Sequence, residues 1–209
     1  MLINIFSTNK KYSIIYADPP WSYIDYTSKY TAQKNTNANS KKSVVMHYEV
    51  MKTRELCELP INNICADDCI LFLWVTMPKL DECFELIKSW GFKYSTCGFT
   101  WIKKNKKNTS TNFWGMGRWT RSNAELCLIA TKGKPQRVSK AVHSVIETPI
   151  EQHSKKPECV RDKIVELCGD LPRIELFARQ HAEGWDCWGN EVSSDPQTHL
   201  IKHTKKSLI

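Results

Sequence analysis

Long uninterrupted apolar runs are missing from this chain of 209 residues. No segment approaches the roughly 20 apolar residues that a membrane-spanning helix needs, and residues 1–16 lack the shorter run of a signal peptide. C-x-x-C pairs are also missing among the nine cysteines, although Cys65-x-x-x-Cys69 with a distant histidine leaves a metal site open. The odd number and scattered spacing of the cysteines favour reduced thiols. We therefore expect a soluble, cytoplasmic protein with no metal and no membrane partner.

Glycine is scarce, with eight residues, and no G-x-G-x-x-G stretch follows a strand candidate. This excludes the ordinary dinucleotide-binding loop of a Rossmann fold. Acidic residues are outnumbered, since 30 Lys and Arg face 22 Asp and Glu, for a formal net charge of +8. A basic chain gains from the counterions that a polyanion releases on binding, which favours a nucleic-acid partner. A solvated basic surface is an equally good interpretation of the charge alone.

Short apolar runs bounded by turn residues alternate with helical patterns along the chain. Buried parallel strands are predicted at 12–17, 70–75, 98–102, 125–131 and 173–178. This alternation is typical of an α/β fold with a doubly wound sheet, which binds ligands at the carboxyl ends of its strands. We expect one domain over 1–191 and a polar tail over 192–209.

Helices are predicted where apolar residues recur every three or four positions. The first spans 78–90, and its inward stripe consists of Leu80, Phe84 and Ile87. The second spans 157–168, and its inward residues are Val160, Ile164 and Leu167. A glycine directly follows each pattern, as is common at helix ends. A short helix is expected near 53–59.

Two polar stretches interrupt this alternation and are predicted to be lid loops. The first spans 22–45. The second spans 103–122 and mixes lysines and arginines with aromatic residues, among them Trp114 and Trp119. Cations that hold a phosphate backbone and aromatic faces on which bases stack are typical of nucleic-acid binding surfaces. The second stretch therefore predicts nucleic-acid contact, with a solubilising loop as the alternative.

The run Asp18-Pro19-Pro20-Trp21 directly follows the strand predicted at 12–17. An aromatic amine is a poor nucleophile because its lone pair is delocalised. A carboxylate and a backbone carbonyl that each accept one N–H would free this lone pair for attack on a methyl group. Proline has no N–H, so we expect the carbonyls of this turn to face a substrate without competing donors. Trp21 offers a stacking face for a flipped base, and a plain turn is the alternative interpretation.

The stretch 17–21 resembles the catalytic turn of adenine-N6 methyltransferases of the DPPW type, the MT-A70-like family. That family includes the catalytic subunit of the eukaryotic mRNA adenosine methyltransferase and bacterial and phage relatives. Five further blocks match the family in order, at 71–75, 101–103, 125–128, 132–135 and 174–179. The resemblance implies S-adenosyl-L-methionine as the cofactor. It also implies a Rossmann-like class I methyltransferase fold, circularly permuted so that the catalytic motif comes early and the cofactor motif late.

The resemblance assigns roles to individual residues. The catalytic residues are Asp18, Pro19, Pro20 and Trp21. The cofactor-binding residues are Asp18, Lys156, Arg179, His181, Asn190 and Glu191. Within this set, Lys156 of the His153-x-x-Lys156-Pro157 element reaches the methionine carboxylate, and Asn190 binds the ribose hydroxyls. The substrate-binding residues are Trp21, Tyr23, Arg118, Trp119, Arg121 and Glu125.

The residues of the catalytic turn also narrow the substrate. Enzymes that methylate cytosine amines tend to carry Ser-Pro-Pro-Tyr, and those that methylate glutamine amides carry Asn-Pro-Pro-Tyr, so Asp18 with Trp21 favours adenine. Resemblance to the phage and bacterial branch favours DNA over RNA as the substrate. It also favours the cytoplasm of a bacterium or a phage-infected host cell as the location. The family habit of pairing catalytic domains favours a homodimer. We expect a short or relaxed target sequence, or recognition shared with a second subunit. The alternatives are an RNA adenosine N6 methyltransferase, a protein methyltransferase, and a non-catalytic nucleic-acid-binding scaffold of the same fold.

Overall fold

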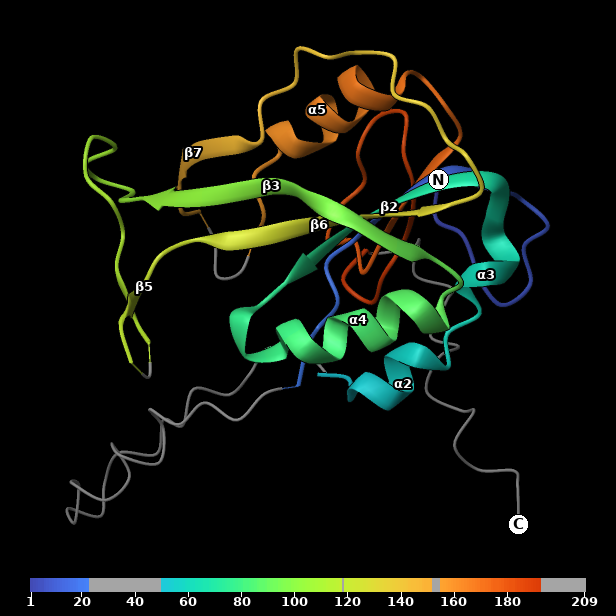
Figure 1. Cartoon of the computed structure of the whole chain (residues 1–209), viewed down its shortest axis with the longest axis horizontal. Coiled ribbons are helices and arrows are strands. Elements are labelled where there is room, and N and C mark those ends of the chain that lie inside the picture. The colour runs from blue at the N-terminus through green and yellow to red at the C-terminus, as the bar shows by residue number, and fades with distance from the viewer. Residues whose placement is uncertain (23–49, 118, 152–154, 193–209) are drawn as a thin grey trace, which may run out of the picture.

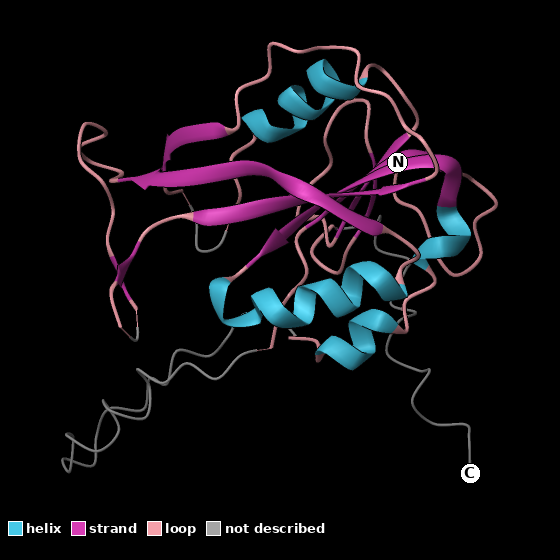
Figure 2. Cartoon of the chain, viewed as in Figure 1, coloured by secondary structure: helices cyan, strands magenta, loops and turns pink. Residues whose placement is uncertain are grey.

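The computed structural model describes residues 1–22, 50–117, 119–151 and 155–192. Seven strands form one sheet in the order β7-β3-β6-β2-β1-β8-β9 (Figures 1 and 2). Their bounds are β1 Tyr12–Ala17, β2 Cys65–Val75, β3 Lys93–Lys104, β6 Glu125–Lys132, β7 Val145–Pro149, β8 Arg173–Leu176 and β9 Asp186–Trp188. A separate two-stranded hairpin consists of β4 Gly115–Met116 and β5 Arg121–Ser122. The helices are α2 Thr53–Cys57, α3 Ile61–Ile64, the 3-10 turn η1 Met77–Lys79, α4 Leu80–Ser89 and α5 Cys159–Cys168.

All five predicted strands are present and the sheet is mostly parallel, as predicted, but β6 does not run parallel to its neighbours as its predicted strand was expected to do. Strand β6 is antiparallel to both of its neighbours, β2 and β3, whereas the other neighbouring pairs of this sheet are parallel. A parallel neighbour requires a crossover that packs across the sheet. The connection from β3 to β6 holds the β4–β5 hairpin instead, so the chain returns directly alongside β3. As a result, β6 begins at the edge where β1, β2 and β3 end.

Helices cover both faces of the sheet, which confirms the predicted α/β class (Figure 2). One core holds Ile15 of β1 and the buried residues of α2, α3 and α4. The other core holds Ile14 and Tyr16 of the same strand together with the buried face of α5. Successive side chains of a strand point to opposite faces, so β1 is buried from both sides. A continuous apolar run is the expected sequence of such a strand.

The two longer helices lie where they were predicted, but one inward residue was assigned wrongly. Helix α4 buries Cys83, Leu86 and Ile87, whereas Phe84 is 43% exposed and packs edge-on against Tyr94 at a centroid distance of 5.2 Å. The contact face is therefore turned by one position, and Phe84 lies at its rim. Within the described ranges, no helix is both long and apolar enough to cross a membrane.

Candidate active site

Asp18 follows β1 at the carboxyl edge of the sheet, where β1 lies between β2 and β8. The turn after it is closed by backbone hydrogen bonds. The Trp21 N–H donates to the Pro19 carbonyl at 2.8 Å, and the Met51 N–H donates to the Pro20 carbonyl at 2.9 Å. The expectation that these carbonyls meet no competing donor is therefore wrong, because the residue after the turn and a distant segment supply one each. A carbonyl oxygen has two lone pairs, so each keeps one further acceptor position.

Trp21 does not provide the stacking face that the sequence suggested. Its side chain is 5% exposed and belongs to the core on the α4 side of the sheet. The indole N–H donates to the carbonyl of Trp74 at 3.2 Å, deep in the structure. A buried indole usually finds such a partner for its N–H while its rings fill the core. The stacking prediction is corrected accordingly, and Trp21 fixes the position of the Asp18 turn.

Lys156 lies just before α5 and reaches across to the Asp18 carboxylate. Its Nζ atom is 2.8 Å from Oδ1 and 2.9 Å from Oδ2 of Asp18, and 5.6 Å from the centre of the Trp74 ring. The side chain of Lys156 is 9% exposed and that of Asp18 is 30% exposed. The two residues are 138 positions apart in the sequence. The fold therefore brings the predicted catalytic and cofactor-side elements into direct contact.

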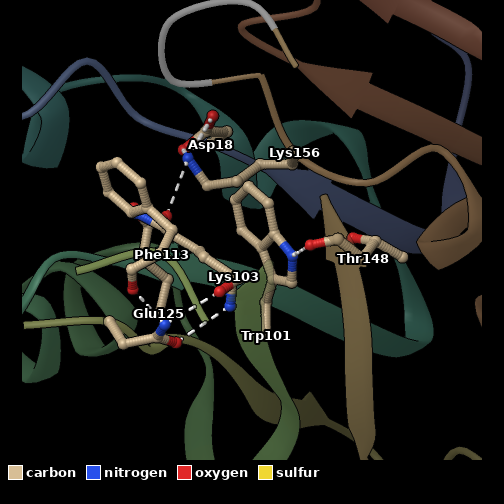
Figure 3. A network of polar contacts seen from close by, with 8 residues as sticks. Asp18, Trp101, Lys103, Phe113, Glu125, Thr148 and Lys156 are labelled. Carbon is tan, nitrogen blue, oxygen red and sulfur yellow. Dashed lines mark hydrogen bonds and ion pairs between the residues drawn. The ribbon is translucent and has the colours of Figure 1, made fainter. Parts of the chain in front are cut away.

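Glu125, the first residue of β6, extends this contact into a chain of four alternating charges (Figure 3). Its Oε2 atom is 3.3 Å from Lys156 Nζ, and its Oε1 atom is 2.5 Å from Lys103 Nζ. Because β6 is antiparallel to its neighbours, its first residue lies at the same edge of the sheet as Asp18. The sequence analysis counted Lys103 among the cations of the second lid loop that were predicted to contact nucleic acid, and it gave Lys103 no role beside Glu125. Its place in the block 101–103 was the available signal.

Burial and neighbouring charges have opposite effects on the pKa values of these ionised side chains. Burial raises the pKa of Asp18 above its ordinary value, and the nearby Lys156 offsets only part of that effect. Burial alone would lower the pKa of Lys156, but Asp18 and Glu125 outweigh it and raise that pKa. Burial works to raise the pKa of Glu125, but Lys156 and Lys103 together hold it below its ordinary value. At neutral pH Lys156 is therefore charged and Glu125 is an anion.

Asn123 anchors the base of the second predicted lid loop, and no sequence pattern pointed to it. Its Oδ1 atom accepts the Lys103 N–H at 2.9 Å, and its Nδ2 atom donates to the Lys103 carbonyl at 2.9 Å. The same Nδ2 atom also donates to the Phe113 carbonyl. Trp101 lies beside this clamp with its indole N–H on the Thr148 carbonyl at 3.2 Å, and the Lys103 Nζ atom is 5.2 Å from its ring centre (Figure 3).

The late predicted cofactor residues lie where β8 and β9 end. The chain turns sharply after β8 because Phe177 takes a φ of 60°, and the Ala178 N–H then donates to the Trp188 carbonyl. A positive φ in a bulky residue is uncommon and marks a constrained turn. Arg179 Nε is 3.5 Å from Glu191 Oε1, and its positive charge acts to lower the pKa of Asp18. Arg179 and Glu191 therefore form a second polar pair beside the Asp18 group.

The other predicted site residues fall into two groups. His181 is exposed, with Nδ1 3.2 Å from Cys187 Sγ, and Asn190 is exposed just after β9. Tyr23, Arg118 and most of the first lid loop and of the tail lie outside the described residues. Among the residues that the structure places, no group of three or more His, Cys, Asp or Glu is arranged to hold a metal ion.

The β4–β5 hairpin projects beyond the end of β3 (Figure 1). Its aromatic and sulfur side chains are open to solvent, with exposures of 51% for Trp114, 72% for Met116 and 88% for Trp119. Arg121 stiffens the hairpin: its Nε atom donates to the Gly115 carbonyl and its Nη2 atom to the Trp114 carbonyl, each at 3.1 Å. Exposed apolar side chains concentrated on one projection are typical of a binding surface.

A mostly parallel sheet covered on both faces, with an acidic Pro-Pro turn at its carboxyl edge, is the arrangement of a Rossmann-like methyltransferase. A sequence profile of the MT-A70 family matches residues 12–191. The chain therefore belongs to the MT-A70 family, and the resemblance drawn from its motifs is confirmed.

Individual proteins that are similar in sequence to this chain are also methyltransferases. A type II methyltransferase, M.MunI, from a Mycoplasma species is 39% identical over 194 residues, which cover 88% of this chain and 78% of the relative. The human N(6)-adenosine-methyltransferase catalytic subunit METTL3 is 26% identical over 194 residues, which cover 91% of this chain and 29% of that protein. The zebrafish METTL3 subunit is 27% identical, with the same coverage. The chain is thus a methyltransferase that spans less than a third of the METTL3 proteins.

Proposed function

We propose that this chain transfers the methyl group of S-adenosyl-L-methionine to the N6 amine of adenine in DNA. The observation that carries the proposal is the carboxylate of Asp18, held at the carboxyl edge of β1 by the buried ammonium of Lys156. A carboxylate in this position is an acceptor for an amine N–H. The carboxylate is partly buried, which raises the pKa of Asp18, and a hydrogen bond to a partly buried carboxylate is stronger than one in open solvent.

The polar groups at this edge fit the proposed cofactor. Lys156 offers an ammonium to the methionine carboxylate, and Arg179 with Glu191 offers a donor and an acceptor to its polar parts. The resemblance implies that Asn190, which is exposed just after β9, would bind the ribose. The Oγ1 atom of Thr76, directly after β2, is buried and has no hydrogen-bond partner among the described residues. When bound, S-adenosylmethionine supplies a methyl group on an electron-poor sulfonium.

The residues of this chain would act by positioning and electrostatics. The Asp18 carboxylate accepts one N–H of the adenine amine, and the remaining acceptor position of a turn carbonyl takes the other. Both bonds withdraw the nitrogen lone pair from the ring, so that it points at the methyl group. The nitrogen would take the methyl group that the bound cofactor supplies, with one nitrogen–carbon bond formed and one carbon–sulfur bond broken, and would release one amine proton. Asp18 is placed to accept that proton.

DNA is favoured because the bacterial type II methyltransferase has a higher identity to this chain than METTL3 has, and because a larger share of its own length is covered, 78% against 29%. The exposed aromatic residues of the β4–β5 hairpin and the net charge of +8 support a nucleic-acid substrate of either kind. The homodimer, the circular permutation and the target sequence stay predictions.

The proposal is tested by incubating the chain with methyl-labelled cofactor and matched adenine-containing DNA and RNA oligonucleotides. We expect label in N6-methyladenine of DNA and none after Asp18→Ala. Transfer to RNA alone would replace DNA as the substrate. If neither oligonucleotide is labelled and calorimetry detects no cofactor binding, the scaffold interpretation is correct.

A further inference from the structure

The carboxylate of Glu125 lies closer to the ammonium of Lys103 than to that of Lys156. The Lys103 ammonium is 2.5 Å from Oε1, whereas the Lys156 ammonium is 3.3 Å from Oε2 and lies nearer to Asp18, at 2.8 Å. Lys156 therefore divides its charge between two carboxylates, and an anionic ligand group that contacts it competes with both. Among the described residues, the carboxylate with which Lys103 forms an ion pair is that of Glu125. Lys103 is the counter-charge that stays with Glu125.

The surroundings of Lys103 hold its ammonium in place. Its backbone is clamped on both sides by Asn123, and its side chain is 19% exposed, the same fraction as that of Glu125. The ammonium also lies 5.2 Å from the ring centre of Trp101, whose own orientation is fixed by the Thr148 carbonyl. A lysine held by its backbone, by an aromatic face and by a carboxylate loses little further freedom when it acts as a counter-charge.

We propose that Lys103 is a positioning residue for substrate adenine, which keeps Glu125 ionised and oriented beside Asp18 while Lys156 is engaged elsewhere. This rests on the proposed function, because it gives Glu125 the task of accepting a hydrogen bond from the base. The charged groups that face Glu125 are Lys103 on β3, Lys156 before α5 and Asp18 after β1. Without Lys103, Lys156 alone opposes the effect of burial on the pKa of Glu125, and we expect the carboxyl group to take up a proton at a higher pH.

The test compares Lys103→Met, which keeps an apolar side chain over Trp101, with Lys103→Arg, which keeps the charge. Lys104→Met is the matched control, since Lys104 is the next residue of β3 and pairs with Glu147 at 3.4 Å instead. We expect the acid limb of the methylation rate to move up by about one pH unit in Lys103→Met, which is a roughly tenfold loss relative to the parent at a pH on that limb and little loss at pH 8. Lys103→Arg should restore the profile, and Lys104→Met should leave it unmoved.

Thermal unfolding supplies a second measurement that does not require activity. A carboxyl group whose pKa is raised by folding is most costly to the fold when it is ionised. In Lys103→Met we expect the pKa of Glu125 to rise, so the stability deficit of the variant relative to the parent should shrink as the pH falls from 6 to about 4, while its activity deficit grows. If Lys103 had only a structural role, the stability deficit and the activity deficit of Lys103→Met would change in the same direction as the pH falls. In a Glu125→Gln background, Lys103→Met should no longer alter the pH dependence of either measurement.

The outcomes separate this inference from the proposed function. If Lys103→Met has the pH profile of the parent, and its stability deficit does not change with pH, the role of Lys103 is refuted. The proposed methylation of adenine at the Asp18 site then still stands. If the parent methylates no adenine but the stability deficit of Lys103→Met still shrinks on acidification, the charge pairing is correct and the proposed reaction is wrong.

Discussion

Replacement of Asp18 by Asn separates catalysis from stability at one position. The substitution keeps the shape of the side chain and one acceptor oxygen but removes the charge that holds an amine N–H. It also places an amide beside the ammonium of Lys156, which is now 2.8 Å from the nearer carboxylate oxygen. Loss of one preorganised hydrogen-bonding group at a reacting centre typically costs about 10²–10³ in rate, or roughly 3–4 kcal/mol. We expect Asp18→Asn to lose methyl transfer by at least that factor.

Stability should change far less than activity. Breaking a fully buried ion pair costs about 3–5 kcal/mol, but three features of this site reduce the cost. Glu125 remains 3.3 Å from Lys156 as a second partner, and the Asp18 side chain is 30% exposed. Folding also raises the pKa of Asp18, so its ionised form opposes folding at neutral pH and the neutral amide relieves that cost. We expect the free energy of unfolding to stay within about 1 kcal/mol of the parent.

The matched control is Asp186→Asn, at the opposite edge of the sheet. Asp186 pairs with Lys10 at 2.9 Å and with the amino group of Met1 at 3.3 Å, and it accepts the Tyr12 hydroxyl at 2.8 Å. Burial works to raise its pKa, but these partners hold it below its ordinary value, so its contribution is present above pH 4 and lost on acidification. Asp186→Asn should cost about 1–2 kcal/mol and leave methyl transfer intact.

Urea denaturation and labelled-methyl incorporation, measured on the same preparations, decide the matter. The reasoning is refuted if Asp18→Asn keeps more than a tenth of the parent rate. It is also refuted if its activity falls only in proportion to the fraction that is unfolded, as a purely structural residue would require.

Three further predictions follow from burial and charge. Because Trp21 is 5% exposed, Trp21→Ala should lower the free energy of unfolding by about 3–5 kcal/mol in urea denaturation; a loss below 1 kcal/mol would contradict its place in the core. Because Trp119 is 88% exposed, Trp119→Ala should leave stability within about 0.5 kcal/mol but weaken oligonucleotide binding by about 1–3 kcal/mol in fluorescence titration, whereas Val138→Ala, also on an exposed residue, should change neither. Arg161 lies 3.0 Å from Glu175, with exposures of 14% and 15%, so Arg161→Met should destabilise the fold by about 3 kcal/mol. Burial raises the pKa of Glu175 despite Arg161, so that loss should be greater at pH 8 than at pH 5, and equal losses at both would refute the pairing.

Much of the fold could be predicted because the core strands are short apolar runs that can be recognised in the sequence. Strand β1 was predicted with its observed bounds, since all but one of its six residues are buried. Strands β7 and β9 were missed because an edge strand need not be apolar, and three of the five residues of β7 are exposed. The antiparallel direction of β6 could not be predicted from the sequence either, because strand direction depends on the path of the connecting chain and not on the strand's own residues.

For the site, the residues along the chain were enough to predict the chemistry: a carboxylate at a strand end, a lysine before a helix, and motifs in an order that identifies the family. Which of these groups meet depends on the folded structure. The contact of Lys156 with Asp18 joins residues 138 positions apart, and Lys103 meets Glu125 because β6 runs against its neighbours. The burial of Trp21 was decided in the same way. Local patterns reveal which face of an element is apolar, but contacts between side chains depend on how distant elements pack.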